Sequence, residues 1–118
     1  MSLTPQEVMN VIADKNRQLT MKNEELMELS EKQADAKKEY LKALAQEITK
    51  LKILGQSVTL IKDLAKGNNA VAELGYKADV AFGVRDACKE KIADLRSGIE
   101  SSRSILSWLK AEFEVSRG

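Results

Sequence analysis

Apolar side chains recur at alternating steps of three and four residues along the second half of the chain. Between residues 71 and 113, thirteen positions follow this spacing and eleven of them are apolar; Arg85 and Ser102 are the exceptions. A repeat of 3.5 residues over six heptads predicts one long helix that packs along a left-handed coiled-coil seam. The predicted seam comprises Val71, Leu74, Ala78, Ala81, Arg85, Cys88, Ile92, Leu95, Ile99, Ser102, Leu106, Leu109 and Phe113.

The first half of the chain shows the same periodicity with interruptions. One heptad phase contains Lys15 and Lys22 and otherwise comprises Val8, Ile12, Leu19, Leu26 and Leu29. After Ala36 the apolar stripe resumes one residue out of phase, at Leu41, Leu44, Ile48 and Leu51. Such a shift changes the supercoil locally and is common where a two-stranded contact widens into a bundle. We expect the seam of this helix to include Leu19, Leu26, Leu44, Ile48 and Leu51.

Proline, glycine and capping residues divide the chain into elements. Thr4, Pro5 and Glu7 form a helix start, with a hydroxyl N-cap, a proline at the first helical position and a carboxylate placed for a capping box. No further glycine or proline occurs before Gly55, and the intervening residues are mainly good helix formers. The first helix is therefore predicted over residues 5–54.

Two more helices follow this first one. Ser57 or Thr59 is placed to cap a short helix over residues 58–66, for which Gly67 fits as a left-handed C-cap. The third helix is predicted over residues 69–115, with Asn68 or Asn69 as its N-cap, the two asparagines standing directly before it.

These elements predict a single all-α domain over residues 1–118, an antiparallel hairpin of two coiled-coil-like helices, each roughly 70 Å long, joined by a short middle helix. One internal seam cannot cover all of the apolar surface. The large side chains that lie off the seam are Met9, Met21, Met27, Val84, Ile105 and Trp108. Because their exposure would forgo several kcal/mol at roughly 25 cal/mol per Å², we expect a homodimer or higher homo-oligomer, most simply a four-helix bundle.

Composition mainly excludes classes of chemistry. The 118 residues include 19 Lys and Arg, 18 Asp and Glu, and no His, so the chain has no imidazole base and no histidine-bearing metal site. A lone Cys88 cannot form an internal disulfide, and the sequence shows neither a secretory signal nor an apolar run of a membrane span's length. We therefore expect a cytoplasmic location, with no membrane association.

The candidate reactive groups each have a structural interpretation that we favour. Cys88 lies on the seam, where a cysteine acts as a small buried hydrophobe. The carboxylates of Glu24, Glu28 and Glu31 share a helix face, but lysines are interleaved with them at salt-bridge spacing. Arg85 either pairs with a carboxylate of the facing helix and sets the register or marks where the helix emerges into solvent; we favour the first. No catalytic residue, metal site or cofactor is predicted, and we expect a protein that is not an enzyme.

Binding chemistry offers two alternatives. Basic and aromatic residues come together only at Lys37, Lys38, Tyr40 and Lys42, and acidic neighbours dilute this group, so direct nucleic-acid binding remains the less favoured alternative. Trp108 is either a binding hot spot or part of a bundle core. The candidate residues for binding a protein partner are Trp108, Met21 and Met27.

The second half of the chain resembles small uncharacterised helical proteins encoded by phages and prophages of Gram-positive bacteria. The residues that carry the likeness are 55–67, 71–74, 95–97 and 107–110. The resemblance implies a setting in early phage gene clusters, often near DNA recombination or replication functions, and implies no mechanism. Together with the helix pattern, it leads us to expect an accessory factor that binds a phage or host protein through helix faces, in phage DNA metabolism or in the inhibition of a host defence protein, with a weak nucleic-acid-binding module as the alternative.

Overall fold

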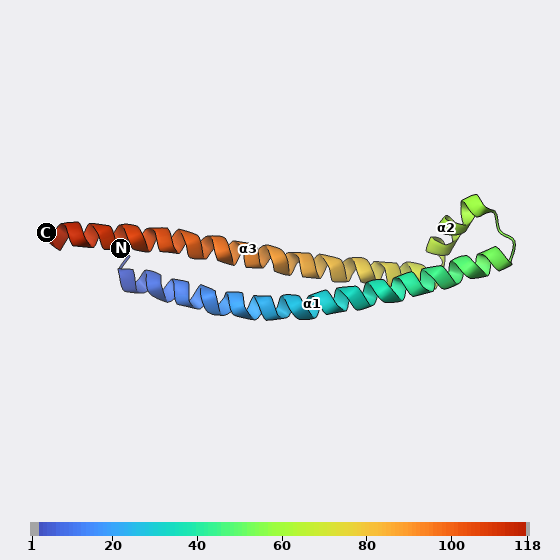
Figure 1. Cartoon of the computed structure of the whole chain (residues 1–118), viewed down its shortest axis with the longest axis horizontal. Coiled ribbons are helices and arrows are strands. Elements are labelled where there is room, and N and C mark those ends of the chain that lie inside the picture. Colours follow the sequence, from blue (N-terminus) through green and yellow to red (C-terminus); the bar gives the residue numbers. More distant parts are fainter. Residues whose placement is uncertain (1–2, 118) are drawn as a thin grey trace. The chain divides into compact units, whose positions relative to one another are not determined.

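The computed structural model describes residues 3–117, which form three α-helices and no strand (Figure 1). They are α1 (Pro5–Ile53), α2 (Val58–Gly67) and α3 (Asn69–Arg117). The all-α class is confirmed. The predicted helix ends at residues 54, 66 and 115 each lie within two residues of the ends in the structure.

The start of α1 is a capping box. The backbone N–H of Glu7 donates to Thr4 Oγ1 at 3.2 Å, and the backbone N–H of Thr4 donates to Glu7 Oε2 at 3.4 Å. These bonds satisfy donors that the first turn of a helix otherwise leaves without a partner. The local sequence therefore defines where α1 begins.

The end of α1 is a Schellman motif centred on a left-handed glycine. Gly55 has a φ of 77°, its N–H donates to the carbonyl of Lys52, and the N–H of Gln56 donates to the carbonyl of Leu51, both at 3.1 Å. Only glycine adopts this backbone conformation without a steric penalty. Gly55 thus ends α1 and turns the chain toward α2.

The junction between α2 and α3 differs from the prediction. Gly67 was expected to be a left-handed cap, but among the described glycines only Gly55 has a positive φ, and Gly67 is the last helical residue of α2. Asn68 instead takes an extended conformation, and its Oδ1 accepts hydrogen bonds from the N–H groups of Ala70 and Val71 at 3.0 and 3.2 Å. One residue therefore ends α2 and caps α3, so no left-handed residue is needed.

The N-terminus of α2 is capped by backbone alone. The carbonyl of Ser57 accepts the N–H groups of Leu60 and Ile61, while its hydroxyl lies 3.0 Å from the hydroxyl of Thr59 and makes no cap to the helix. The two residues that were predicted as alternative caps thus contact each other.

Contacts group the described residues into two compact units, and the single domain expected over residues 1–118 stays a prediction. Unit 1 consists of residues 3–26, which include the start of α1, and residues 87–117 of α3, and unit 2 consists of Met27–Asp86. Two packed helices have no central core, so each stretch of the seam contacts only its own neighbours.

Within each unit the segments of α1 and α3 run antiparallel. In unit 1, Lys22 lies against Cys88 and Lys15 lies against Gly98; in unit 2, Gln33 bonds Arg85 and Tyr40 contacts Gly75. In both units, the partner residues on α3 have lower numbers as the residue numbers on α1 increase. The expected helical hairpin is therefore present.

Candidate interaction surface

The predicted seam positions of α3 are covered to different extents. Those that are buried comprise Val71, Cys88, Ile92, Leu95, Ile99 and Ser102, and those that are half-buried comprise Leu74, Ala78, Ala81, Arg85, Leu106 and Leu109. On α1 the expected seam residues Leu19, Leu26, Leu44, Ile48 and Leu51 are all half-buried. Val8 is the one buried residue of α1, whereas the seam of α3 has six.

The prediction that Phe113 belongs to the seam was wrong. Its heptad position placed it against α1, but it is 58% exposed. Among the described residues of unit 1, the groove beside Phe113 is bordered on the side facing α3 by Leu3 and Pro5. Because α1 begins at Pro5, α3 has no full turn of partner helix at this height.

The phase shift predicted near Ala36 is only partly present. The original heptad phase continues through half-buried positions at Gln33, Ala36, Tyr40, Ala43 and Glu47. Leu44, Ile48 and Leu51 of the shifted phase are also half-buried, whereas Leu41 is exposed. Positions of both phases are therefore partly covered in the C-terminal part of α1, which belongs to unit 2 together with α2.

Two lysines that interrupt the heptad lie where α3 offers small groups or a hydrogen bond. A Cβ added at Gly98 would meet Lys15 Nζ at 2.6 Å, so the lysine side chain crosses over the glycine. The Cys88 thiol donates to the carbonyl of Lys22 at 3.5 Å. Lys22 Nζ turns aside to Glu25 Oε2 at 2.8 Å, and this hydrogen bond and charge raise the pKa of Lys22.

Arg85 pairs with a neutral amide, which corrects the expected carboxylate partner. Its Nη1 donates to Gln33 Oε1 at 3.2 Å, and its Nε is buried with no hydrogen-bond partner among the described residues. The register of the two helices places an amide rather than an acid opposite this arginine. Register setting by the Arg85–Gln33 bond stays a prediction.

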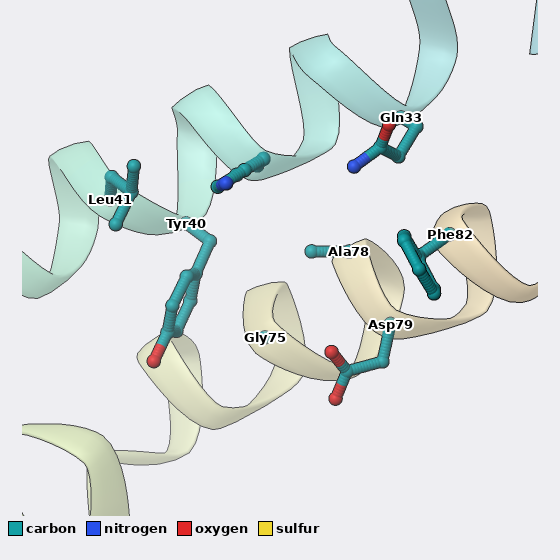
Figure 2. A pocket seen from close by; sticks show the side chains of 8 residues that line it. Gln33, Tyr40, Leu41, Gly75, Ala78, Asp79 and Phe82 are labelled. Atoms are coloured by element: carbon teal, nitrogen blue, oxygen red, sulfur yellow. The ribbon is translucent and has the colours of Figure 1, made fainter. Parts of the chain in front are cut away.

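A cleft of about 300 Å³ opens between α1 and α3 in unit 2 (Figure 2). Its floor is made of small residues, and its rim carries two exposed apolar side chains and two opposite charges. The lining residues are Gln33, Lys37, Tyr40, Leu41, Gly75, Ala78, Asp79 and Phe82. The ring of Tyr40 lies against Gly75, where an added Cβ would approach its Cε1 to 3.0 Å.

Alanine substitutions at two glycines of α3 in unit 2 test this contact. Gly83 has no neighbour within 4 Å of an added Cβ, so Gly83→Ala is expected to raise the free energy of unfolding by about 1 kcal/mol through helix propensity alone. Gly75→Ala has the same gain in helix propensity, but its added Cβ must displace the Tyr40 ring. The free energy of unfolding of Gly75→Ala is therefore expected to be at least about 1 kcal/mol lower than that of Gly83→Ala. Urea unfolding followed by circular dichroism measures both; equal gains would show that the ring does not pack on Gly75.

The candidate partner-binding residues are all exposed. Trp108 is 62% exposed in unit 1, as is Met21 at 69%, and Met27 in unit 2 is 71% exposed. None of the three therefore belongs to the seam between α1 and α3.

Sequence reasoning singled out Lys37 and Tyr40 only as a basic and aromatic group and missed the cleft that they line. A signal for it was the pair of small residues Gly75 and Ala78, which face the bulkier seam of α1 in an antiparallel hairpin.

Residues 3–117 hold neither a cluster of metal-ligand side chains nor a helix suited to span a membrane. In this part of the chain, no cluster of three or more Cys, Asp or Glu side chains is arranged to hold a metal ion. None of the helices within these residues combines the length and apolar character of a membrane span.

Comparison with protein families, with curated proteins and with solved structures finds no match to this chain.

Proposed function

We propose that the protein is a non-enzymatic interaction protein that binds a protein partner through exposed faces of its helices. The observation that supports this proposal is the exposure of Trp108, Met21 and Met27, each more than 60% accessible. Tryptophan supplies a large, rigid contact area and methionine adapts its shape to a partner, so both favour protein interfaces. The proposal places the protein in the cytoplasm of a host cell as a phage or prophage accessory factor, in DNA metabolism or in inhibition of a host defence protein.

The proposal includes self-association into a homodimer, most simply a four-helix bundle. Each unit has only one seam between α1 and α3, and many large apolar side chains lie outside it, among them Val80, Val84 and Ile105. A second copy would cover part of this surface at a gain of roughly 25 cal/mol per Å². Analytical ultracentrifugation tests it, and a strict monomer at micromolar concentration would contradict it.

Partner capture from phage-infected or lysogenic cells tests the binding function. Immobilised wild-type protein is expected to retain a phage or host protein, and Trp108→Ala is expected to weaken the purified complex by at least about tenfold, as for a hot-spot residue. Lys110→Ala, at an exposed polar position near Trp108 on α3, serves as the control and should leave the affinity unchanged. Equal affinities for both variants would remove Trp108 from the binding surface.

A salt titration separates the protein partner from the nucleic-acid alternative. We expect no binding to single-stranded or double-stranded nucleic acid at about 50 mM salt, because acidic residues neutralise the basic groups along both long helices. Binding that is present at low salt and falls steeply as salt rises would instead favour a weak nucleic-acid-binding module.

A further inference from the structure

We infer that the cleft of unit 2 is a homodimer interface, in which the same cleft of a second copy docks face to face about a two-fold axis parallel to the helices. This inference rests on the proposed self-association and names the surface that carries it. The cleft is formed by Lys37, Tyr40 and Leu41 of α1 and by Gly75, Asp79 and Phe82 of α3 (Figure 2).

The register of unit 2 determines which residues would meet across such an axis. Gln33 bonds Arg85 and the Tyr40 ring lies against Gly75, so residues of α1 and α3 at similar height along the helices are known to within about one turn. A two-fold axis parallel to the helices exchanges α1 and α3 without changing height. Each residue of α1 therefore lies over the α3 residue of the second copy that it already faces within its own chain.

Large and small side chains alternate across this arrangement. Leu41 is exposed and lies next to Tyr40, so it would reach the second copy at the height of Gly75. Phe82, also exposed, lies three residues before Arg85 and would therefore reach the second copy between Gln33 and Ala36, a stretch that includes the small, exposed Ala34. Phe82 would thus pack near the small Ala34 of the second copy, and Leu41 would pack beside the Tyr40 ring that covers Gly75; helix bundles pack large side chains against small ones in this way.

Under this symmetry the charges of the cleft in one copy are complementary to those of the cleft in the second copy. Lys37 and Asp79 line the cleft from opposite helices, and within the described residues neither forms an ion pair. The two-fold axis brings Lys37 of each copy over Asp79 of the other, so a dimer has two attractive contacts. An unrelated partner has no reason to match this pattern, whereas a second copy matches it by symmetry.

Charge reversal tests the interface with a rescue that only an intermolecular contact permits. Lys37→Glu alone sets a glutamate against Asp79 twice per dimer, and Asp79→Lys alone sets a lysine against Lys37 twice per dimer. Each single variant is expected to weaken dimerisation by about tenfold or more, since two exposed pairs change from attraction to repulsion. An equimolar mixture of the two variants allows a heterodimer in which one contact pairs Lys37 with Asp79 and the other pairs the two introduced residues, again with opposite charges. This heterodimer is expected to form about as tightly as the wild-type dimer.

Sedimentation velocity at matched concentrations measures all four samples, and circular dichroism confirms that both variants keep the wild-type helix content. Phe82→Glu, which buries a charge at the same interface, is expected to give a monomer as an independent check. If the wild-type protein is a dimer and neither charge reversal weakens it, the cleft of unit 2 is not the dimer interface, although self-association itself is confirmed. A monomeric wild-type protein would overturn self-association itself. If each single variant weakens the dimer but the equimolar mixture of the two variants does not restore it, the proposed two-fold arrangement is wrong.

Discussion

Leu95→Ala is expected to lower the free energy of unfolding by about 2–4 kcal/mol, one of the two largest effects in this protein. Leu95 is only 6% exposed and lies between Ile92 and Ile99 on the best-covered stretch of α3. Truncation removes buried apolar surface and leaves a space that two packed helices cannot close. Thermal and urea unfolding, followed by circular dichroism at 222 nm for α-helix, measures the loss.

Ile105→Ala is the matched control for this variant. Ile105 lies on the same helix and in the same unit but is 43% exposed, so its truncation is expected to cost about 1 kcal/mol or less. A loss at Ile105 as large as that at Leu95 would mean that the outer face of α3 is covered in solution. Repeating both measurements at low and high protein concentration would then show whether a second copy provides that cover.

The double substitution Gln33→Leu with Arg85→Leu is expected to raise the free energy of unfolding by about 1–3 kcal/mol. Arg85 holds a charge in a partly covered seam, and its Nε is buried without a partner among the described residues. Replacing both members of the Arg85–Gln33 pair removes this desolvation cost and fills the seam with apolar groups. Urea unfolding of the double variant and of each single variant measures the effect.

The single variants show what the pair contributes. Gln33→Leu leaves the Arg85 guanidinium without its only hydrogen-bond acceptor among the described residues and is expected to lower stability by about 1–3 kcal/mol. A stabilising Gln33→Leu would contradict the importance of the 3.2 Å bond. If Arg85→Leu keeps the wild-type oligomeric state and register, the arginine does not set the register; a change in either supports that role.

Local sequence was sufficient to predict the helices because the signals that start and stop them are short. The Thr4 and Glu7 capping box and the helix stop at Gly55 involve residues a few positions apart, and the structure has both; the left-handed conformation of Gly55 was not predicted. The prediction of a left-handed C-cap at Gly67 was wrong because the sequence Gly-Asn is compatible with two ways of ending a helix. An extended Asn68 ends α2 and caps α3 in one step, which sequence alone does not distinguish from a left-handed glycine.

Features that depend on register could not be predicted in the same way. The heptad repeat indicates which face of α3 is covered, but not which residue of α1 lies opposite each position. The amide partner of Arg85 and the exposure of Phe113 both follow from the alignment of α1 with α3. The cleft has the same origin, since it requires Tyr40 of α1 to meet Gly75 of α3 across the hairpin.

The division of the chain into two units has a consequence for the order of folding. Unit 2 is one continuous segment, Met27–Asp86, whereas unit 1 joins the two ends of the chain. The Arg85 and Gln33 contact of unit 2 closes a separation of 52 residues, and the Cys88 and Lys22 contact of unit 1 closes one of 66. Once unit 2 has formed, the helical segments that make unit 1 start from adjacent points, so most of their loop-closure entropy has already been lost. The hairpin should therefore close from its turn toward its termini, and the termini should be the first part to open.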